Sequence, residues 1–179
     1  MDFSRVSLDS NDVVSARGSQ KKWFPYSKGG AFRKWYGNND YVVNFINDGA
    51  EICEYIDNTP GVKVGSNGRV INREYYFRPA VTWSLTSSFG FGARFRPEGY
   101  IFDVNGMSLF ADEERLQELV GFLNSKVTTA ALAAINPTMA FQVGDICKLP
   151  VVVVEKKLEL LSKVKVCIEI SKENWDSLS

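Results

Sequence analysis

The sequence predicts an α+β fold, in which short, mostly antiparallel strands pack on one long helix and a C-terminal amphipathic helix follows. Three observations support this prediction. Segments rich in aromatic and β-branched residues occupy the middle of the chain, a long amphipathic pattern follows them, and a second amphipathic pattern lies near the end. The strand-like and helix-like segments do not alternate, which disfavours repeating βαβ units.

The first third of the chain begins with a polar stretch. Residues 1–20 are rich in Ser and Asp, which predicts an irregular lead-in. Residues 23–36 predict two short strands around a Gly29-Gly30 turn. Residues 41–55 carry apolar side chains at mixed spacing, which we interpret as a helix interrupted by one glycine. The Pro and Gly residues of 58–68 predict a long loop.

The middle of the chain predicts strands. Residues 75–84 are rich in aromatic and β-branched side chains, and Pro79 marks an edge or a bulge. Residues 89–96 alternate aromatics with Gly, Ala and Arg, which indicates a strand with one crowded face and one small or basic face. Residues 100–110 predict a strand pair around Asn105-Gly106, because this dipeptide is a strong hairpin signal.

The last third predicts helices. Asp112 can cap a helix over residues 113–134, whose apolar side chains recur on one face and which Asn136-Pro137 would end. Residues 141–149 predict a short strand or loop. Residues 155–171 predict a second helix with a narrow apolar stripe, which is typical of packing on a neighbouring helix or on a partner.

Charge is balanced over the whole chain but segregated along it. The 179 residues carry 21 basic and 21 acidic side chains, so binding to nucleic acid would require local clustering of cations. Residues 17–36 hold six cations and no acid, and residues 69–96 hold five cations and one acid, Glu74. These two stretches could form one basic face or two unrelated solvated faces.

The segment Trp23–Asn38 combines aromatic and basic residues around the Gly-Gly pair. Trp and Tyr supply flat faces with a polar edge, while Lys and Arg neutralise phosphates and Arg can also bind a guanine edge. Glycine allows close approach of the backbone to a ligand. The segment therefore suits a nucleic-acid groove. The alternative is a surface strand-turn-strand with core aromatics and solvated cations.

Other aromatic residues fit a core better than a base-stacking surface, because they alternate with polar residues in strands. These predicted core residues are Trp83, Phe89, Phe91, Phe95, Phe102 and Phe110. Trp23, Trp35 and Tyr36 fit either role equally well.

The composition disfavours catalysis by this chain alone. The sequence has no histidine, and its three cysteines are widely spaced, so Ser-His-Asp, Cys-His and zinc chemistry are not expected. Few, unpaired cysteines indicate a reduced, cytoplasmic protein. Asn136-Pro137-Thr138-Met139 is the nearest approach to the [DN]-P-P-[YF] motif of adenine methyltransferases, and it lacks the second proline and the aromatic residue. No metal site, cofactor or membrane contact is expected.

Five collinear strings resemble the C-terminal part of BREX-type adenine-specific DNA methyltransferases, the PglX family. They are Trp23–Asn38, Tyr76–Ser84, Leu123–Lys126, Asn136–Pro150 and Ile170–Ser177. Related segments occur in the specificity domains of type I and type IIG restriction-modification enzymes. The resemblance implies a DNA target-recognition domain over residues 21–150, preceded by the lead-in 1–20 and followed by a C-terminal helix and fragment end over 151–179.

The resemblance also implies partners. A separate N-terminal domain of the parent enzyme would bind S-adenosylmethionine and flip the adenine, while this chain would bind double-stranded DNA. The family's catalytic motif has no counterpart here, so no catalytic residue is assigned. Other defence-system subunits are further expected partners. The alternative function is a protein-interaction module of a defence complex, which binds a partner subunit or a phage protein.

The expected DNA-binding residues have three roles. Lysines would neutralise phosphates, arginines would contact base edges or phosphates, and glycines would let the backbone enter a groove. The predicted set is Lys21, Lys22, Lys28, Gly29, Gly30, Arg33, Lys34, Trp35, Arg73, Arg78, Arg94, Arg96 and Lys126.

Overall fold

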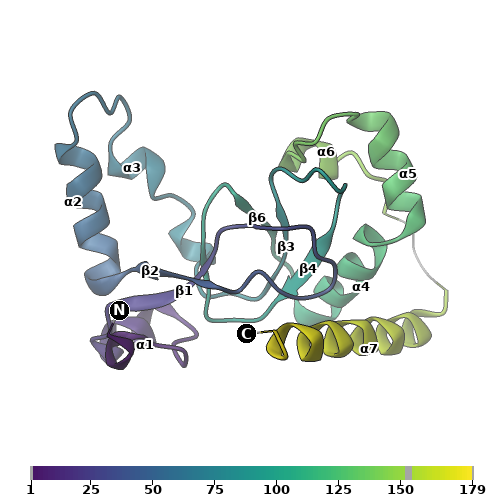
Figure 1. The fold of residues 1–179 in the computed structure, drawn as a ribbon, viewed down its shortest axis with the longest axis horizontal. Helices are drawn as coiled ribbons and strands as arrows, with labels where there is room; N and C mark the ends of the chain where they lie inside the picture. The colour runs from purple at the N-terminus through teal and green to yellow at the C-terminus, as the bar shows by residue number, and fades with distance from the viewer. Residues whose placement is uncertain (1, 152–154, 179) are drawn as a thin grey trace. The chain divides into compact units, whose positions relative to one another are not determined.

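The computed structural model describes residues 2–151 and 155–178, and the chain divides into two compact units. Unit 1 comprises residues 2–26, Asn39–Arg78 and Pro97–Ile101, and unit 2 comprises Ser27–Asn38, Pro79–Arg96 and the described residues from 102 onward. Residues 1, 152–154 and 179, which fall in the predicted lead-in and C-terminal segment, lie outside the described residues. Both units combine helices and strands, so the predicted α+β class is confirmed (Figure 1).

Unit 1 is built on the antiparallel pair of β1 (Trp23–Ser27) and β2 (Tyr41–Asn44). Trp23 lies opposite Asn44, and Tyr26 lies opposite Tyr41. The strand β5 (Ile101–Phe102), whose first residue belongs to this unit, borders β1 on the other side.

Four buried aromatic rings form the core of unit 1. Phe24 contacts Phe45 and Phe77 at centroid distances of 6.2 and 6.0 Å, and Phe45 contacts Tyr76 at 5.7 Å. All three contacts are edge-to-face, the arrangement that aromatic quadrupoles favour. The rings therefore join β1 to segments far away in the sequence.

Short helices complete unit 1. The unit holds η1 (Phe3–Arg5), α1 (Val13–Ser19), η2 (Ile46–Gly49), α2 (Ala50–Asn58), α3 (Ser66–Arg69) and η3 (Arg73–Tyr75). The predicted irregular lead-in thus contains α1, which the Asp12 side chain caps by accepting from the Ser15 amide. The helix predicted over 41–55 is wrong in its first part, because Val42 and Val43 pair with β1 and the helix begins only after Gly49.

Unit 2 contains an antiparallel sheet in the order β4-β3-β6, formed by β3 (Ala80–Ser84), β4 (Ala93–Arg96) and β6 (Gly106–Leu109). Thr82 lies opposite both Arg94 and Ser108, so the twofold periodicity of strands gives the sheet one polar and one apolar face. The polar face consists of Thr82, Ser84, Arg94, Arg96 and Ser108. Of the strand predicted over residues 89–96, only Ala93–Arg96 forms, and its two arginines lie on this polar face.

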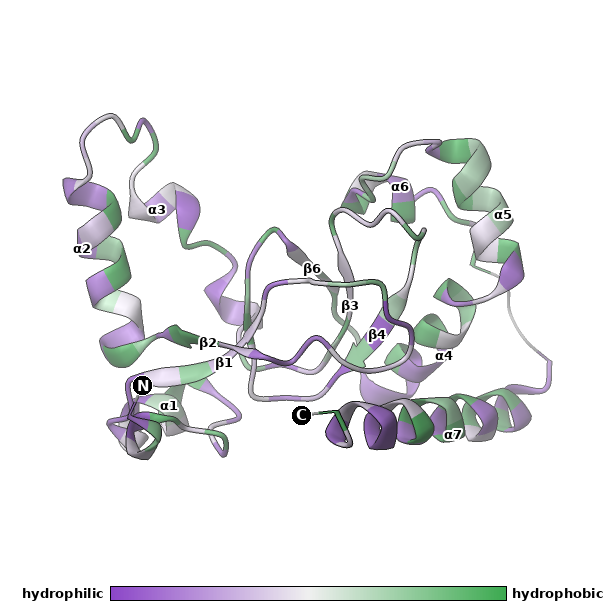
Figure 2. Ribbon diagram, viewed as in Figure 1, coloured by the Kyte–Doolittle hydropathy of each residue, from purple (hydrophilic) through white to green (hydrophobic). Residues whose placement is uncertain are grey.

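Helices cover the apolar face of this sheet. Unit 2 holds α4 (Glu113–Leu123), α5 (Lys126–Ile135), α6 (Val143–Ile146) and α7 (Lys157–Asp176). Val81 and Trp83 share one buried cluster with residues of α4, and the Trp83 indole donates to the Phe141 carbonyl at 2.9 Å. α7 runs alongside α4 (Figure 1), and its partner helix therefore lies within this chain. Apolar and polar residues alternate along α7 (Figure 2), of which Leu161 and Val164 are buried.

Three further predicted elements differ from those in the structure. The hairpin predicted over 100–110 is wrong, because β5 borders β1 whereas β6 pairs with β3. Asp103 accepts from the amides of Asn105 and Gly106, which forms a side-chain-stabilised turn between them. The second strand predicted in 23–36 does not form; Trp35 instead makes a single parallel bridge to Arg94. Residues 141–149 contain the short helix α6.

The single helix predicted over 113–134 is two helices, α4 and α5. Asp112 caps the first as predicted, since its carboxylate accepts from the Arg115 amide. Asn124 ends it by exchanging two hydrogen bonds with the backbone of Ala93, at 3.0 and 2.8 Å. The Ser125 hydroxyl then accepts from the Thr128 amide and caps α5.

Candidate nucleic-acid interface

The part of the aromatic and basic stretch that belongs to unit 2, Ser27–Asn38, lies against the unit-2 sheet, and we call it the basic segment. The Gly30 amide donates to the Ser84 hydroxyl at 3.1 Å, and that hydroxyl lies 2.9 Å from the Gly30 carbonyl. Further along, the Trp35 amide donates to Ala93 and the Trp35 carbonyl accepts from Phe95, both at 2.8 Å. The basic segment is thereby fixed to β3 and to the edge of β4.

Glycines allow this close approach. A Cβ atom at Gly29 would collide with the Asn105 carbonyl, and one at Gly106 would collide with the Ser27 carbonyl. Gly29 also has a φ of +82°, which favours glycine. Gly29 is buried in this contact, whereas Gly30 is exposed. Of the predicted pair, therefore, Gly29 serves packing on the sheet and Gly30 faces solvent.

Arg94 and Arg96 are buried on the polar face, with 2% and 1% of their surfaces exposed. Arg94 makes one long hydrogen bond, of 3.3 Å, to the Ser84 hydroxyl, and its Nε has no hydrogen-bond partner among the described residues. Burial lowers the pKa of Arg94 to about 10, so the side chain stays charged at neutral pH. Arg96 donates to Ser108 at 2.9 Å. In this structure both arginines lie within the protein.

Arg33 is stacked on the end of α7. Its guanidinium carbon lies 4.6 Å from the centre of the Trp175 ring, which is a cation–π contact. Arg33 and Trp175 are both half-buried. A Cβ at Gly37 would lie 2.9 Å from the same ring, so the glycine makes room for the indole. The neighbouring Lys34 donates to the Asn124 carbonyl at 3.2 Å. The C-terminal helix and the α4–α5 junction therefore hold the basic segment in place.

Lys28 and Lys126 are the predicted cations of unit 2 that are exposed. Lys28 precedes the Gly29-Gly30 pair, and Lys126 is the first residue of α5. Exposed lysines suit contact with phosphates, because a flexible, hydrated ammonium group needs no fixed geometry.

The other four predicted cations belong to unit 1 and contact the protein itself. Lys21 donates to the Ser4 carbonyl, and Lys22 donates to the Glu51 carboxylate. Arg73 donates to the Asp48 carbonyl at 2.7 Å and to the sulfur of Cys53 at 3.1 Å. Arg78 lies over the Tyr75 ring at 5.4 Å.

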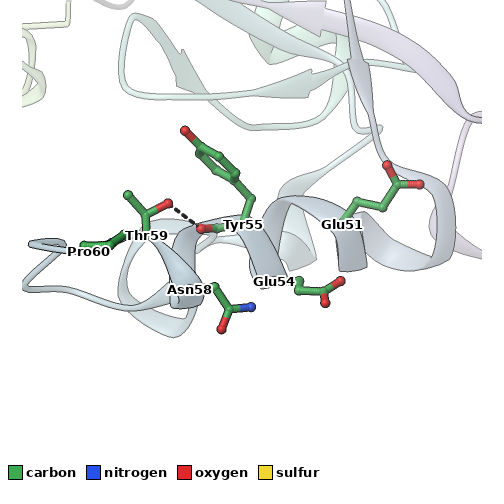
Figure 3. Close-up of a pocket in the computed structure, with 6 residues that line it drawn as sticks. All are labelled: Glu51, Glu54, Tyr55, Asn58, Thr59 and Pro60. Atoms are coloured by element: carbon green, nitrogen blue, oxygen red, sulfur yellow. Dashed lines mark hydrogen bonds between the residues drawn. The ribbon is translucent and has the colours of Figure 1, made fainter.

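A depression on unit 1 follows helix α2 (Figure 3). Its lining residues are Glu51, Glu54, Tyr55, Asn58, Thr59 and Pro60. The Thr59 hydroxyl donates to the Tyr55 carbonyl at 2.6 Å, which closes the end of the helix. Two carboxylates and no cation line this depression, so its charge disfavours a polyanion.

A second depression, of about 330 Å³, lies on unit 2 beside the basic segment. It is lined by Gly30, Ala31, Phe32, Thr86, Ser87, Ser88, Phe89 and Met139. The core position predicted for Phe89 is wrong, because Phe89 is 82% exposed in the loop between β3 and β4, next to Gly90, which has a φ of +94°. Trp83 and Phe91 are buried as predicted, and Phe95, Phe102 and Phe110 are half-buried. The sequence signal for an exposed Phe89 was its position between Ser-Ser and Gly.

Within 2–151 and 155–178, no group of three or more Cys, Asp or Glu side chains is arranged to hold a metal ion. Over these residues, no helix is both long and apolar enough to cross a membrane.

The chain is similar to one part of two adenine-specific methyltransferases. It is 41% identical over 158 residues to "Adenine-specific methyltransferase PglX" of Lacticaseibacillus casei (strain Zhang), and 35% identical over 177 residues to "Adenine-specific methyltransferase BrxX" of Escherichia coli O9:H4 (strain HS). The resemblance predicted from the sequence is thus confirmed.

The matches cover 88% and 97% of this chain, but the chain spans only 13% of the length of each relative. The similarity therefore concerns a segment of these enzymes. No family model matches the chain.

Proposed function

We propose that this chain is the target-recognition part of an adenine-specific DNA methyltransferase in a phage-defence or restriction-modification system. It would position duplex DNA for a catalytic domain that lies outside this sequence. The observation that carries the proposal is the similarity of almost the whole chain to a 13% segment of two adenine-specific methyltransferases. The parent enzyme would take its methyl group from S-adenosylmethionine, for which we assign no residue of this chain.

The geometry supports a division of labour within unit 2. Exposed Lys28 and Lys126 would contact phosphates, while buried Arg94 and Arg96 would support the basic segment from below. Arg33 is the candidate for reading a base. The contact with Trp175 limits the freedom of its guanidinium group, and arginine can bind a guanine edge with two hydrogen bonds.

Unit 1 would contribute secondary contacts. Lys21, Lys22, Arg73 and Arg78 contact protein groups, so we assign them to the stability of the unit. Because they are cations, we also assign them to phosphate positioning.

Titration of labelled duplex DNA with the protein tests the proposal. Fluorescence anisotropy is recorded at salt concentrations from about 50 to 200 mM, and a random duplex library is selected for binding. We expect the logarithm of the association constant to fall linearly with the logarithm of the salt concentration, and the selected duplexes to share a short sequence. Absence of binding at the lowest salt concentration would contradict a DNA-contacting role.

A protein-interaction module is the second candidate function. The observation that favours it is the set of exposed apolar side chains on α7, among which Leu158 is 83% and Ile170 is 60% exposed. Such residues suit a partner subunit or a phage protein. The titration separates the two candidates, because a protein-binding surface gives no log-linear loss of DNA affinity with salt.

A further inference from the structure

The depression beside the basic segment has exposed apolar side chains that the proposed function does not explain. Its rim holds three exposed apolar side chains, Phe32, Phe89 and Met139, of which Phe89 is 82% and Met139 58% exposed. A large exposed aromatic side chain loses the free energy of burial, so its position at a loop tip calls for an explanation.

The loop that presents Phe89 is anchored at its base. Two residues further on, Phe91 is buried against Trp83 and Phe141, at centroid distances of 6.1 and 5.2 Å. On the other side of the tip, the Ser87 amide donates to the Met139 carbonyl at 3.0 Å. Phe89 is therefore an exposed ring on a supported loop, an arrangement that suits insertion into a partner.

The charges around the depression identify the kind of partner. No Asp or Glu lines it, and three cations lie within two residues of its lining segment Gly30–Phe32 in the sequence. They are the exposed Lys28 and the half-buried Arg33 and Lys34. Such an environment favours an anionic partner, and duplex DNA is the anionic partner of the proposed function.

Hydroxyl groups flank the exposed ring. Thr86, Ser87 and Ser88 directly precede Phe89 and line the same depression. The Ser87 hydroxyl is buried, whereas Thr86 and Ser88 are exposed. Ser and Thr hydroxyls commonly contact phosphates and sugars of DNA, so Thr86 and Ser88 place groups that suit the DNA backbone beside the apolar tip.

We propose that Phe89 is a wedge that inserts between two stacked base pairs of bound duplex DNA. The exposed Thr86 and Ser88 would contact the DNA backbone beside this step. Apolar side chains such as Phe unstack a base step and kink the duplex when they insert in this way. The inference rests on the proposed DNA-binding function and adds a deformation of the DNA to it.

The test uses the 179-residue protein and a duplex enriched by the library selection, with 2-aminopurine placed at one adenine position after another. Unstacking raises the fluorescence of 2-aminopurine. We expect the wild-type protein to raise it at one step, Phe89→Ala to abolish the rise and weaken binding roughly 5- to 100-fold, and Phe89→Leu to retain part of the rise.

Phe3→Ala is the matched control, because Phe3 is equally exposed, at 82%, and belongs to unit 1. It should leave both readouts unchanged. If Phe89→Ala binds with wild-type affinity and keeps the fluorescence rise, the proposed insertion of Phe89 is wrong, while the proposed DNA-binding function is not contradicted. A partner protein that covers Phe89 would give this same outcome. If the wild-type protein does not bind DNA at all, the proposed function itself fails.

Discussion

At the scale of single residues, the contact of Arg33 with Trp175 leads to the most direct test of the proposed base reading. We expect Arg33→Ala to cost roughly 1–3 kcal/mol of binding free energy on the cognate duplex and little on other sequences. Arg33→Lys should not restore the difference, because an ammonium group offers no bidentate pair. Anisotropy on cognate and scrambled duplexes measures both. Equal losses on the two duplexes would contradict base reading and leave Arg33 a phosphate contact.

Trp175 should act through Arg33. We expect Trp175→Ala to reduce discrimination between cognate and scrambled duplexes less than Arg33→Ala does, since the guanidinium remains but loses its oriented stacking. A double-mutant cycle measures this coupling. Additive losses would show that the two side chains act separately.

Gly29 offers a test of how the basic segment is fixed. Gly29 and Gly61 have nearly the same φ, +82° and +81°, but only at Gly29 would a Cβ meet other atoms. We expect Gly61→Ala to cost about 1–2 kcal/mol of unfolding free energy, from backbone strain alone. Gly29→Ala should cost clearly more, because it also collides with the Asn105 carbonyl. Denaturant unfolding compares the two, and equal costs would mean that the segment moves freely off the sheet.

At the scale of elements, the sequence predicts whether a segment is a helix or a strand better than it predicts which other segment it contacts. Helix periodicity and the Asp112 cap located α4, but the Asn124 amide that ends it bonds to Ala93, a contact with a residue distant in sequence. No local pattern reveals such a contact. The Asn105-Gly106 turn is real, yet the strands on its two sides belong to different sheets, because β6 pairs with β3. Pairing depends on which edges are available in the fold.

The junction of α7 and α4 should depend on pH. The Lys157 ammonium bridges the carboxylates of Glu114 and Glu118, and hydrogen bonds from Lys157 and Arg115 lower the pKa of Glu118. A carboxyl whose pKa is lowered on folding stabilises the protein above its unfolded pKa, near 4.5, and this stabilisation is lost as the pH falls through the folded value. The same contacts raise the pKa of Lys157 to about 12, so its contribution is complete below 10.5.

We therefore expect Glu118→Gln to lower the Tm by about 1–4 °C at pH 7. The difference should disappear in acid, once the wild-type carboxyl is protonated. Thermal unfolding monitored by circular dichroism at both pH values measures this. Glu169→Gln, on the exposed side of α7, is the control and should change the Tm at neither pH. A difference that persists in acid would point to packing instead of charge.

At the scale of the whole molecule, the sequence reveals the composition of the segment 23–38 but not which of its side chains are exposed. The aromatic and basic composition of the segment 23–38 is visible without a structure, and so is its resemblance to the methyltransferases. Exposure is not visible in the same way. Arg94 and Arg96 belong to the predicted DNA-binding set and are buried, whereas Phe89 belongs to the predicted core and is exposed. Strand alternation assigns residues to faces, but only the packing of the basic segment on the sheet shows which face is covered.

The exposed lysines give the final prediction, which concerns the electrostatic field of the molecule. Because the net charge is zero, DNA affinity must come from few local contacts, and each lost phosphate contact should reduce the salt slope by about one unit. We expect Lys28→Gln with Lys126→Gln to weaken binding to all duplexes alike and to reduce the slope by about two. Lys165→Gln, an exposed lysine on α7, should leave the slope unchanged. A double variant with the wild-type slope would place the phosphate contacts elsewhere, with the cations of unit 1 as the next to be substituted.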